Sequence, residues 1–470
     1  MDYELIVRNA APAGEAADGA TVDVALGHGI VAALAAGGTL AGSAAAELDA
    51  TGLHLLPGGI DAHVHCNEPG RTDWEGFATA SAALATGGFT AYLDMPLNAR
   101  PATVDVAAFD AKLARAKRDS LVDFGLWGGL VPGNRAQLEP LHARGVVGFK
   151  AFMCETGIPD FRPVDDTELW EGMREIAALG SILAVHAESE TITATLTARA
   201  RAAGSTDAAA YLASRPPVVE SEAIACAIAL AADTRCRLHI AHVSTYEGVA
   251  LVQAARARGI DVSWETTPHH LVFVAADVER IGPLAKCSPV VHDETNRERL
   301  WQAVTNDPSA IIASDHSPAP PQLKAGEDFF SIWGGISSCQ TTLGTVLAGL
   351  ADEPACASIA AAALAANPAR RFGLAGKGAV EVGRDADLVL LDLAHAWTLR
   401  AEELRYRHPH SPFVGRQLRG AVRHVFARGE RLVDEGTPRV TDHRGHLLRP
   451  RPPDGRPGRR SSASEVPSTG

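Results

Sequence analysis

The chain has 470 residues, of which 46% are hydrophobic and 21% charged, and its 43 basic residues against 56 acidic ones give a formal net charge of -13. This composition is typical of a soluble globular protein large enough to bury a sizeable core, and it excludes the disordered and fibrous classes. The acidic balance also argues against a nucleic-acid partner, because an acidic surface repels a phosphate backbone.

The N-terminal segment predicts neither export nor membrane insertion. Asp2 and Glu4 stand where a secretory signal carries a basic cluster, and no small-residue cleavage site follows. The longest uncharged run, residues 24–46, is mostly Ala and Gly and contains His28, so we interpret it as strand and turn. Seven cysteines without a C-x-x-C pair favour reduced thiols. We therefore expect a cytoplasmic protein with no membrane contact.

Eight short apolar runs follow one another through the middle of the chain, separated by turn residues and by segments of helical character. The predicted strands are residues 56–65, 89–95, 122–128, 146–152, 182–186, 237–243, 261–266 and 310–314. The predicted crossover helices include residues 105–119, 167–179, 221–232, 246–258 and 294–305. This α/β alternation predicts a (β/α)8 barrel over residues 56–376. A doubly wound open sheet is the alternative, but no G-x-G-x-x-G follows the first strand.

The two flanks have a different pattern. Residues 1–55 and 377–435 contain short alternating strands separated by Gly and Asp, and we predict that they meet as one small composite β-sandwich beside the barrel. From residue 449 to 470 the chain consists largely of Arg, Pro, Gly and Ser, a composition that predicts a disordered tail.

Metal-ligating residue types gather at the predicted C-terminal ends of the strands, where a barrel of this type carries its active site. The first strand ends in His63 and His65, and the alternation of side chains along a strand places both on one face. The fifth, sixth and eighth strands lead to His186, His242 and Asp315. A single histidine at a strand end is commonly structural, but a metal site explains all five residues together, with ligands suited to zinc.

Lys150 lies at the end of the fourth apolar run. Burial and neighbouring positive charge both lower the pKa of a lysine and favour its neutral amine. A neutral amine can add carbon dioxide and become a carbamate whose two oxygens can bridge two metals. The residues alone leave open the alternative that Lys150 extends to solvent.

Several stretches of the chain resemble the amidohydrolase superfamily, in particular its cyclic amidases: the allantoinases, the dihydroorotases and the hydantoinases or dihydropyrimidinases. These stretches are residues 57–76, 94–98, 314–321, 323–326 and 333–336. The resemblance extends from about residue 1 to 435 and is nearest to the allantoinases. It supports the barrel with its small β-sandwich.

The resemblance also implies a binuclear metal centre with two divalent ions, of which zinc is the expected one. The implied ligands are His63, His65 and Asp315 for one ion, His186 and His242 for the other, and Lys150 as a bridging N6-carboxylysine. A water bridging the two ions becomes hydroxide near neutral pH. Asp315 is the implied general acid and base, which moves a proton from this water to the leaving ring nitrogen.

Two positions separate the subfamilies. Dihydroorotases hold a substrate carboxylate with an Arg and an Asn, whereas this chain has Asn67 and Leu97 there, and a buried carboxylate without the Arg is costly. Hydantoinases have a Tyr shortly after the bridging lysine, whereas residues 150–155 read Lys-Ala-Phe-Met-Cys-Glu. The resemblance therefore predicts hydrolysis of allantoin to allantoate. The candidate substrate contacts are Asn98, Ser288, Trp333 and Gly334.

Two other readings stay open. One is a hydantoinase-, dihydropyrimidinase- or dihydroorotase-like enzyme acting on a different cyclic amide. The other is a non-catalytic scaffold of the same fold, against which the complete set of implied ligands argues. Residues 266–270, Thr-Thr-Pro-His-His, differ from the usual family pattern and leave the outer substrate contacts open. The resemblance further implies a small cyclic ureide as substrate and a homo-oligomer, tetramer or dimer.

Overall fold

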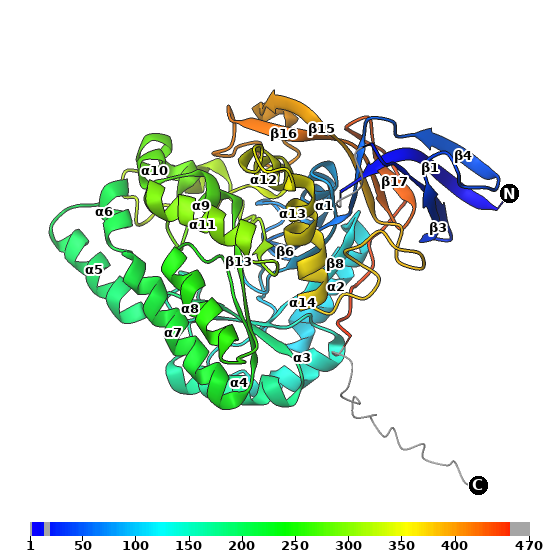
Figure 1. Cartoon of the computed structure of the whole chain (residues 1–470). Helices are drawn as coiled ribbons and strands as arrows, with labels where there is room; N and C mark the ends of the chain where they lie inside the picture. Colours follow the sequence, from blue (N-terminus) through cyan, green and yellow to red (C-terminus); the bar gives the residue numbers. More distant parts are fainter. Residues whose placement is uncertain (1, 14–18, 452–470) are drawn as a thin grey trace, which may run out of the picture.

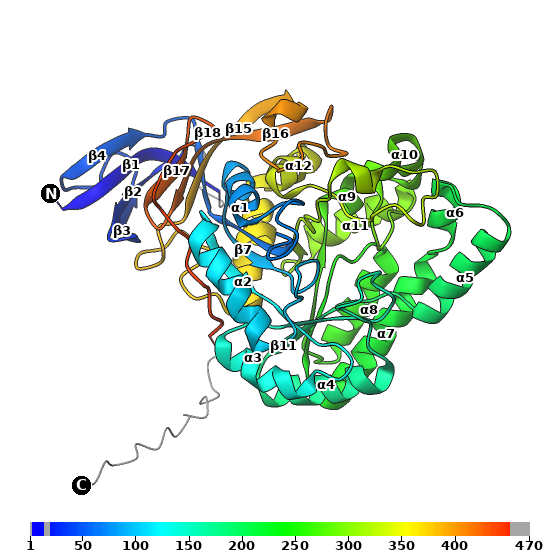
Figure 2. The same cartoon turned by 180° about the vertical axis from the view of Figure 1, so that it is seen from behind.

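The computed structural model describes residues 2–13 and 19–451, so the predicted tail lies outside the described residues from position 452 onward. A barrel forms the larger part of the molecule, and strands from both ends of the chain lie beside it (Figures 1 and 2). None of the helices in these ranges combines the length and the apolar character that crossing a membrane requires.

The middle of the chain forms the predicted (β/α)8 barrel of parallel strands. Its strands are β6 (Gly59–Val64), β7 (Phe89–Asp94), β8 (Asp123–Leu126) with β9 (Gly128–Gly129), β10 (Phe149–Phe152), β11 (Ile182–His186), β12 (Arg237–Ile240), β13 (Val262–Thr266) and β14 (Ile311–Ile312). β8 and β9 are the two halves of one barrel strand, interrupted at Trp127, whose amide donates to the Asp94 carbonyl at 3.0 Å. The barrel closes where the His65 amide donates to the His316 carbonyl at 2.8 Å.

One predicted strand, residues 56–65, is wrong as a single element. The structure divides it into β5 (His54–Pro57), which belongs to the sheet of the chain ends, and β6 of the barrel. The division falls at Gly58, where a Cβ atom would lie 2.1 Å from Thr90 Oγ1. The chain can therefore change sheets there only without a side chain.

Helices cover the outside of the barrel. They are α1 (Phe77–Thr86), α2 (Val106–Asp119), α3 (Leu138–Arg144), α4 (Asp166–Ala178), α5 (Glu190–Ala202), α6 (Ala208–Ala213), α7 (Pro217–Thr234), α8 (Tyr246–Ala257), α9 (Pro268–Val272), α10 (Ala275–Ile281), α11 (Glu294–Asn306), α12 (Thr342–Gly349), α13 (Cys356–Ala361) and α14 (Asn367–Arg371). The five predicted crossover helices correspond to α2, α4, α7, α8 and α11. The sequence did not predict α5, because it buries only Thr193 fully and so lacks an apolar stripe.

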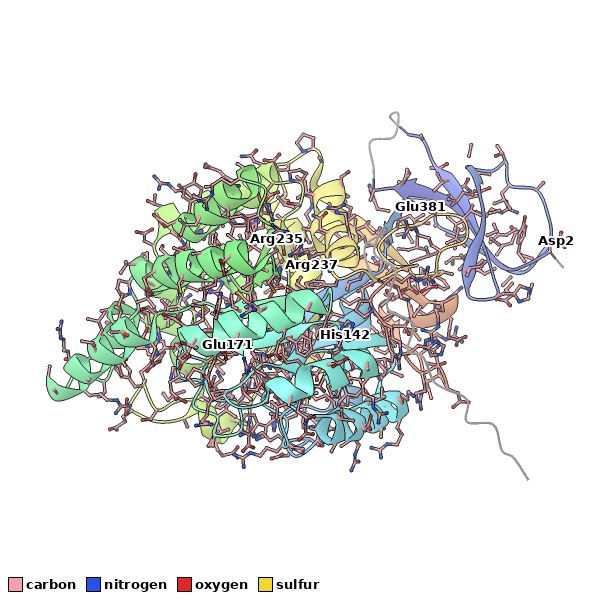
Figure 3. The ribbon with its side chains drawn as sticks, turned by 90° about the horizontal axis from the view of Figure 1, so that it is seen from below. Asp2, His142, Glu171, Arg235, Arg237 and Glu381 are labelled. Carbon is pink, nitrogen blue, oxygen red and sulfur yellow. The ribbon has the colours of Figure 1, made fainter. Side chains whose placement is uncertain are left out.

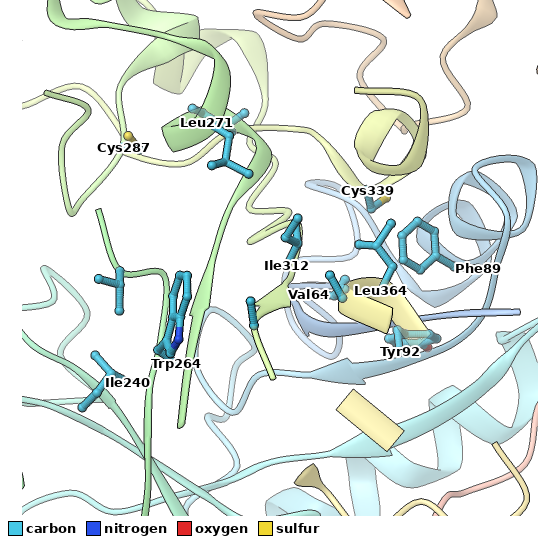
Figure 4. Packing of buried hydrophobic residues seen from close by; sticks show 14 of the residues in the cluster. Val64, Phe89, Tyr92, Ile240, Trp264, Leu271, Cys287, Ile312, Cys339 and Leu364 are labelled. Carbon is cyan, nitrogen blue, oxygen red and sulfur yellow. The ribbon is translucent and has the colours of Figure 1, made fainter. Parts of the chain in front are cut away.

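The barrel strands separate two cores. Along β11, Leu183 and Val185 point outward into the large core against the helices, whereas Ile182 and Ala184 point into the barrel. Figure 4 shows the outer core around Trp264 and Val64, where neighbouring strands and helices meet. Because both faces of each strand are buried, the strands read in the sequence as short continuous apolar runs.

The ends of the chain form the second part. Its strands are β1 (Tyr3–Pro12), β2 (Val22–Gly27), β3 (Ile30–Ala36), β4 (Ala44–Asp49), β5, β15 (Leu388–Thr398), β16 (Gln417–Ala427), β17 (Glu430–Asp434) and β18 (Thr437–Pro438). β1 pairs with β2 and β4 and also with β5, which continues through β15 to β18. Residues 24–46 thus lie in strands and turns, as predicted.

Side chains from both terminal segments, such as Val24 and Leu390, share one apolar core. Lys377 ties this part to the barrel: its buried ammonium donates to Asp123 at the start of β8, at 2.6 Å, and to Asp387 before β15, at 2.8 Å. Beyond β18 the chain returns along the barrel, where the Leu448 amide donates to the Phe124 carbonyl at 2.7 Å.

Candidate metal centre

The barrel mouth brings a first group of ligand atoms together from two strands that are distant in sequence. His63 and His65 come from the end of β6, and Asp315 follows β14. Asp315 Oδ1 lies 3.4 Å from Nε2 of His63 and 3.4 Å from Nε2 of His65. Both histidines are buried. Two ligands about 2.1 Å from one tetrahedral ion lie roughly 3.4 Å apart, so this spacing fits a shared metal.

His186 and His242 form a second group beside the first. His186 Nδ1 lies 3.0 Å from His242 Nε2, and the rings of His63 and His242 are 5.3 Å apart between centroids. Phe152 stacks on His186 at 4.4 Å and fixes the plane of that imidazole. Burial lowers the pKa of both His63 and His242, which keeps the rings neutral and able to ligate a metal.

Lys150 points into the barrel and faces both groups. Its side chain is fully buried, and Nζ has no hydrogen-bond partner among the described residues. Burial lowers its pKa to about 8, and its charge acts on both His63 and His242. An unpaired buried ammonium is costly. A carbamate on Nζ would convert this amine into an anionic oxygen ligand between the two histidine groups, which is the chemistry that a metal-bridging lysine needs.

The backbone is strained at the same place. Asp315 and His242 have φ angles of 43° and 37°, and Asn67 and Asn98 at the same mouth have φ angles of 62° and 69°. Such left-handed conformations are uncommon for residues other than glycine and gather at functional sites. Four of them on the loops at one end of the barrel mark this end as the site of function.

Glu265, a buried carboxylate that the sequence did not predict, orients His63 of the first group. Glu265 on β13 lies with Oε1 2.6 Å from Nδ1 of His63, and its Oε2 lies 3.1 Å from Nε2 of His239. His239 Nδ1 in turn contacts the Ser263 hydroxyl at 2.7 Å. With Nδ1 bound to a carboxylate, His63 presents Nε2 toward Asp315, the arrangement typical of metal-ligating histidines. The available signal was a charged residue inside a predicted strand.

Replacement of Glu265 by glutamine is expected to weaken metal binding by roughly 10- to 100-fold, because an amide orients and polarises His63 less well than a carboxylate. Competition with a chelator measures this affinity. Asp23→Asn is the matched control, since Asp23 is also a fully buried carboxylate but lies in β2, away from the centre. Equal chelator resistance of the Glu265 variant and the wild type contradicts the assignment.

Glu188 orients a histidine of the second group, as Glu265 does for the first. Its Oε2 lies 2.7 Å from Nε2 of His186 and accepts a hydrogen bond from the Ser288 hydroxyl at 2.5 Å. Although burial alone raises a carboxyl pKa, His186 and Arg215 bring the pKa of Glu188 to about 2. Ser288, a predicted substrate contact, is thus linked through Glu188 to a predicted metal ligand. Cys154 lies against the same group.

The other predicted substrate contacts lie on loops around the mouth. Asn98 Nδ2 lies 3.5 Å from the Ser317 hydroxyl, two residues after Asp315. Trp333 packs edge-on against Trp74 at 4.8 Å, and the Arg71 guanidinium lies 4.4 Å from the Trp74 ring centroid and donates to the Asn98 carbonyl at 3.1 Å. The structure therefore brings Asn98 and Trp333 together through Arg71 and Trp74, two residues that the sequence analysis did not select.

Two buried lysines hold the loop that carries Trp333 and Gly334. Lys286 Nζ donates to the carbonyls of Phe330, at 3.2 Å, and Ile332, and Lys324 Nζ donates to the carbonyls of Trp333, at 3.0 Å, and Gly335. Burial lowers the pKa of each lysine to about 7. The two amines fix the backbone of the loop, and neither forms a salt bridge with a carboxylate of the described residues.

These lysines predict a pH dependence of stability. Between pH 7 and 8.5 an unfolded lysine, with its ordinary pKa of 10.5, stays protonated while Lys286 loses its proton in the folded state. The unfolded chain then binds more protons, so the free energy of unfolding rises with pH. Lys286→Met is expected to reduce this slope by about 1 kcal/mol per pH unit. Urea titrations across this range measure it, with exposed Lys117→Met as control; parallel curves for Lys286→Met and wild type disprove it.

Comparison with known proteins agrees with this geometry. Residues 54–432 match the amidohydrolase family. An allantoinase of Rubrobacter xylanophilus is 51% identical, with 95% of this chain and 98% of the relative covered, and one of Deinococcus radiodurans is 45% identical, with 96% and 100% covered. The solved structure of the L-hydantoinase (dihydropyrimidinase) from Arthrobacter aurescens has a TM-score of 0.90 at 34% identity, covering 95% of this chain and 100% of that one. The similarity thus spans nearly the whole chain.

Proposed function

The chain belongs to the amidohydrolase family, and we propose that the two ligand groups at its barrel mouth form a binuclear centre for the hydrolysis of a cyclic amide. The protein is a cyclic amidohydrolase that opens the ring of allantoin to give allantoate. The observation that carries the proposed centre is the convergence of both groups on one buried lysine without a hydrogen-bond partner among the described residues, Lys150.

In this proposal each group holds one divalent ion. His63, His65 and Asp315 would hold the first ion, His186 and His242 would hold the second, and Lys150, as N6-carboxylysine, would be a ligand shared by both. Imidazole and carboxylate ligands suit zinc, which we propose as the metal. When bound, the two ions lower the pKa of water so that hydroxide is available near neutral pH, and they polarise the substrate carbonyl.

Asp315 carries the proton. Burial alone raises the pKa of this carboxyl, but His63 and His65 hold it below the ordinary value, so the carboxylate is ionised at neutral pH. Asp315 accepts the proton of the attacking water while the C–O bond forms, and it donates this proton to the ring nitrogen as the C–N bond breaks. The product is an open-chain carboxylate.

The residues at the mouth support allantoin, a hydantoin ring with an uncharged ureido arm. Asn67 and Leu97 replace the Arg and Asn that would bind the carboxylate of dihydroorotate. Asn98, Ser288 and the backbone at Trp333 and Gly334 supply hydrogen-bonding groups for ureide N–H groups and carbonyls. The complete set of proposed metal ligands argues against a non-catalytic scaffold of the same fold.

We also propose an oligomeric state and a cellular compartment for the enzyme. Family membership supports a homo-oligomer, a dimer or a tetramer. The seven cysteines are all free, which supports a reducing compartment such as the cytoplasm.

Metal content and ring opening test the proposal together. The protein is purified with bicarbonate and divalent metal, and product formation is followed with allantoin, hydantoin, dihydrouracil and dihydroorotate. Two metals per chain and a preference for allantoin are expected. Two metals with preference for another amide would overturn the substrate assignment, and neither metal nor hydrolysis would favour the scaffold.

A further inference from the structure

A second polar site lies at the opposite end of the barrel from the proposed metal centre. A cavity of about 220 Å³ opens there between the N-terminal ends of the strands, α8 and α14. Among its lining residues are Arg237, Arg256, Ser263, Asn367, Arg370 and Arg371. Figure 3 shows this end of the molecule from below, with Arg237 labelled at the start of β12. This cavity plays no part in the proposed hydrolysis.

The charges around the cavity do not balance. Asp261 contacts Arg237 at 3.4 Å and also pairs with Arg371, and Asp307 pairs with Arg256 at 2.7 Å. Four arginines therefore face two carboxylates, which leaves an excess of two positive charges. Asp261 is also half exposed to solvent, so its charge is partly screened. A bound dianion would neutralise the excess.

Three of the four arginines, Arg237, Arg256 and Arg371, are held in place by hydrogen bonds to backbone carbonyls. Arg371 donates through Nη2 to the Leu238 carbonyl at 2.7 Å, and Arg256 donates through Nε to the Val262 carbonyl at 2.8 Å. Arg371 Nε is buried and has no hydrogen-bond partner among the described residues. Arg370 uses Nη2 on Asn367 at 2.5 Å and is otherwise exposed at the rim. Preorganised guanidinium groups with unused N–H donors are suited to a tetrahedral oxyanion.

Burial lowers the pKa of Arg371, and Arg237 and Arg256 lower it further against the opposing effect of Asp261. The mutual repulsion of these cations is therefore incompletely relieved by the acids present. The volume matches a small ligand: at about 30 Å³ per water, the cavity has room for about seven waters, or for a phosphate group with a small organic part.

We propose that this arginine cavity binds a phosphate-type dianion, either inorganic phosphate or the phosphate group of a small monoester. Near neutral pH such a group carries nearly two negative charges and offers three or more acceptor oxygens. The cavity wall also connects with the active site, because Ser263 is the outer end of the contacts through His239 and Glu265 to His63. A ligand in the cavity would thus lie at the outer end of the contacts from Ser263 through His239 and Glu265, which support the proposed metal ligand His63.

Calorimetric titration of the metal-loaded full chain at constant ionic strength tests the proposal, with inorganic phosphate, ribose 5-phosphate and sodium chloride as separate probes. One phosphate per chain is expected to bind with a rise in the unfolding temperature. Tighter binding of ribose 5-phosphate identifies a monoester site, and tighter binding of inorganic phosphate identifies a site for the free ion. An equal temperature shift with chloride overturns the proposal.

The variants separate this cavity from the metal centre. Arg370→Gln is expected to weaken phosphate binding roughly tenfold or more, through the loss of a charge-assisted contact. Arg235→Gln is the matched control, because Arg235 is an exposed arginine at the same end of the molecule that does not line the cavity (Figure 3). Arg256→Gln provides a second lining variant. Phosphate binding that competes with allantoin and is unaffected by both lining variants places the ion at the metal centre and overturns the proposal.

Discussion

Replacing Lys150 with methionine is expected to abolish ring opening, with kcat falling by at least roughly 10³-fold, while the metal-free protein becomes no less stable. The two effects have one cause. Lys150 Nζ is buried and without a hydrogen-bond partner among the described residues, so the folded apoprotein loses no hydrogen bond when the amine is removed and is relieved of a buried charge. The side chain is needed only for the bridge between the proposed metals. Kinetics with allantoin, metal analysis and thermal unfolding of the apoprotein measure the three quantities.

Lys112 provides the matched control for this experiment. It is also fully buried, but its ammonium donates to Asp94 at 2.6 Å and to the Met95 carbonyl at 2.7 Å. Lys112→Met leaves the Asp94 carboxylate buried and unpaired and is expected to cost about 3 to 5 kcal/mol of stability. If the two variants lose stability equally, Lys150 has a structural role and the proposed bridge is wrong.

The Asp315→Asn variant is expected to lower kcat by at least roughly 10³-fold, because the amide can neither accept the proton of the attacking water nor return it to the leaving nitrogen. The proposed substrate contacts on Asn98 and Ser288 are unchanged in this variant, so KM should move much less than kcat. Steady-state kinetics with allantoin, together with metal analysis of the same sample, test this expectation.

Asp73→Asn is the control for Asp315, because Asp73 is an exposed carboxylate on a loop of the same barrel mouth. Its activity should stay close to that of the wild type. A modest loss in Asp315→Asn with both metals retained would remove Asp315 from proton transfer and leave it as a ligand alone.

The sequence predicted the barrel because its strands have a simple signature. Strands such as β11 and β13 are buried on both faces and bounded by turn residues, so their number and order can be counted along the chain. The change of sheet at Gly58 could not be predicted, because it depends on the contact with Thr90, more than 30 residues later. No local pattern distinguishes a broken strand from a continuous one.

The predicted ligands share one property, namely that each lies at or just beyond a strand end. Glu265 and Glu188 were missed because their role depends on which face of the barrel they occupy and on which histidine they meet. The arginine cavity could be predicted from the sequence even less well than these two carboxylates. Arg237, Arg256 and Arg371 come from β12, α8 and α14, and only the packing of these elements shows that they face one space.

The position of β5 has a consequence for biosynthesis. This strand lies between β1 and β15, and Leu55 pairs with Leu390, about 335 residues later in the chain. At roughly 5 to 20 residues per second, the ribosome needs about 17 to 67 s to deliver that partner. During this time strands β1 to β5 can pair with one another, but β15, the strand that pairs with the free edge of β5, has not yet been synthesised. We expect nascent chains stalled before β15 to depend on chaperones, and the enzyme to reach its protease-resistant form only after synthesis is nearly finished.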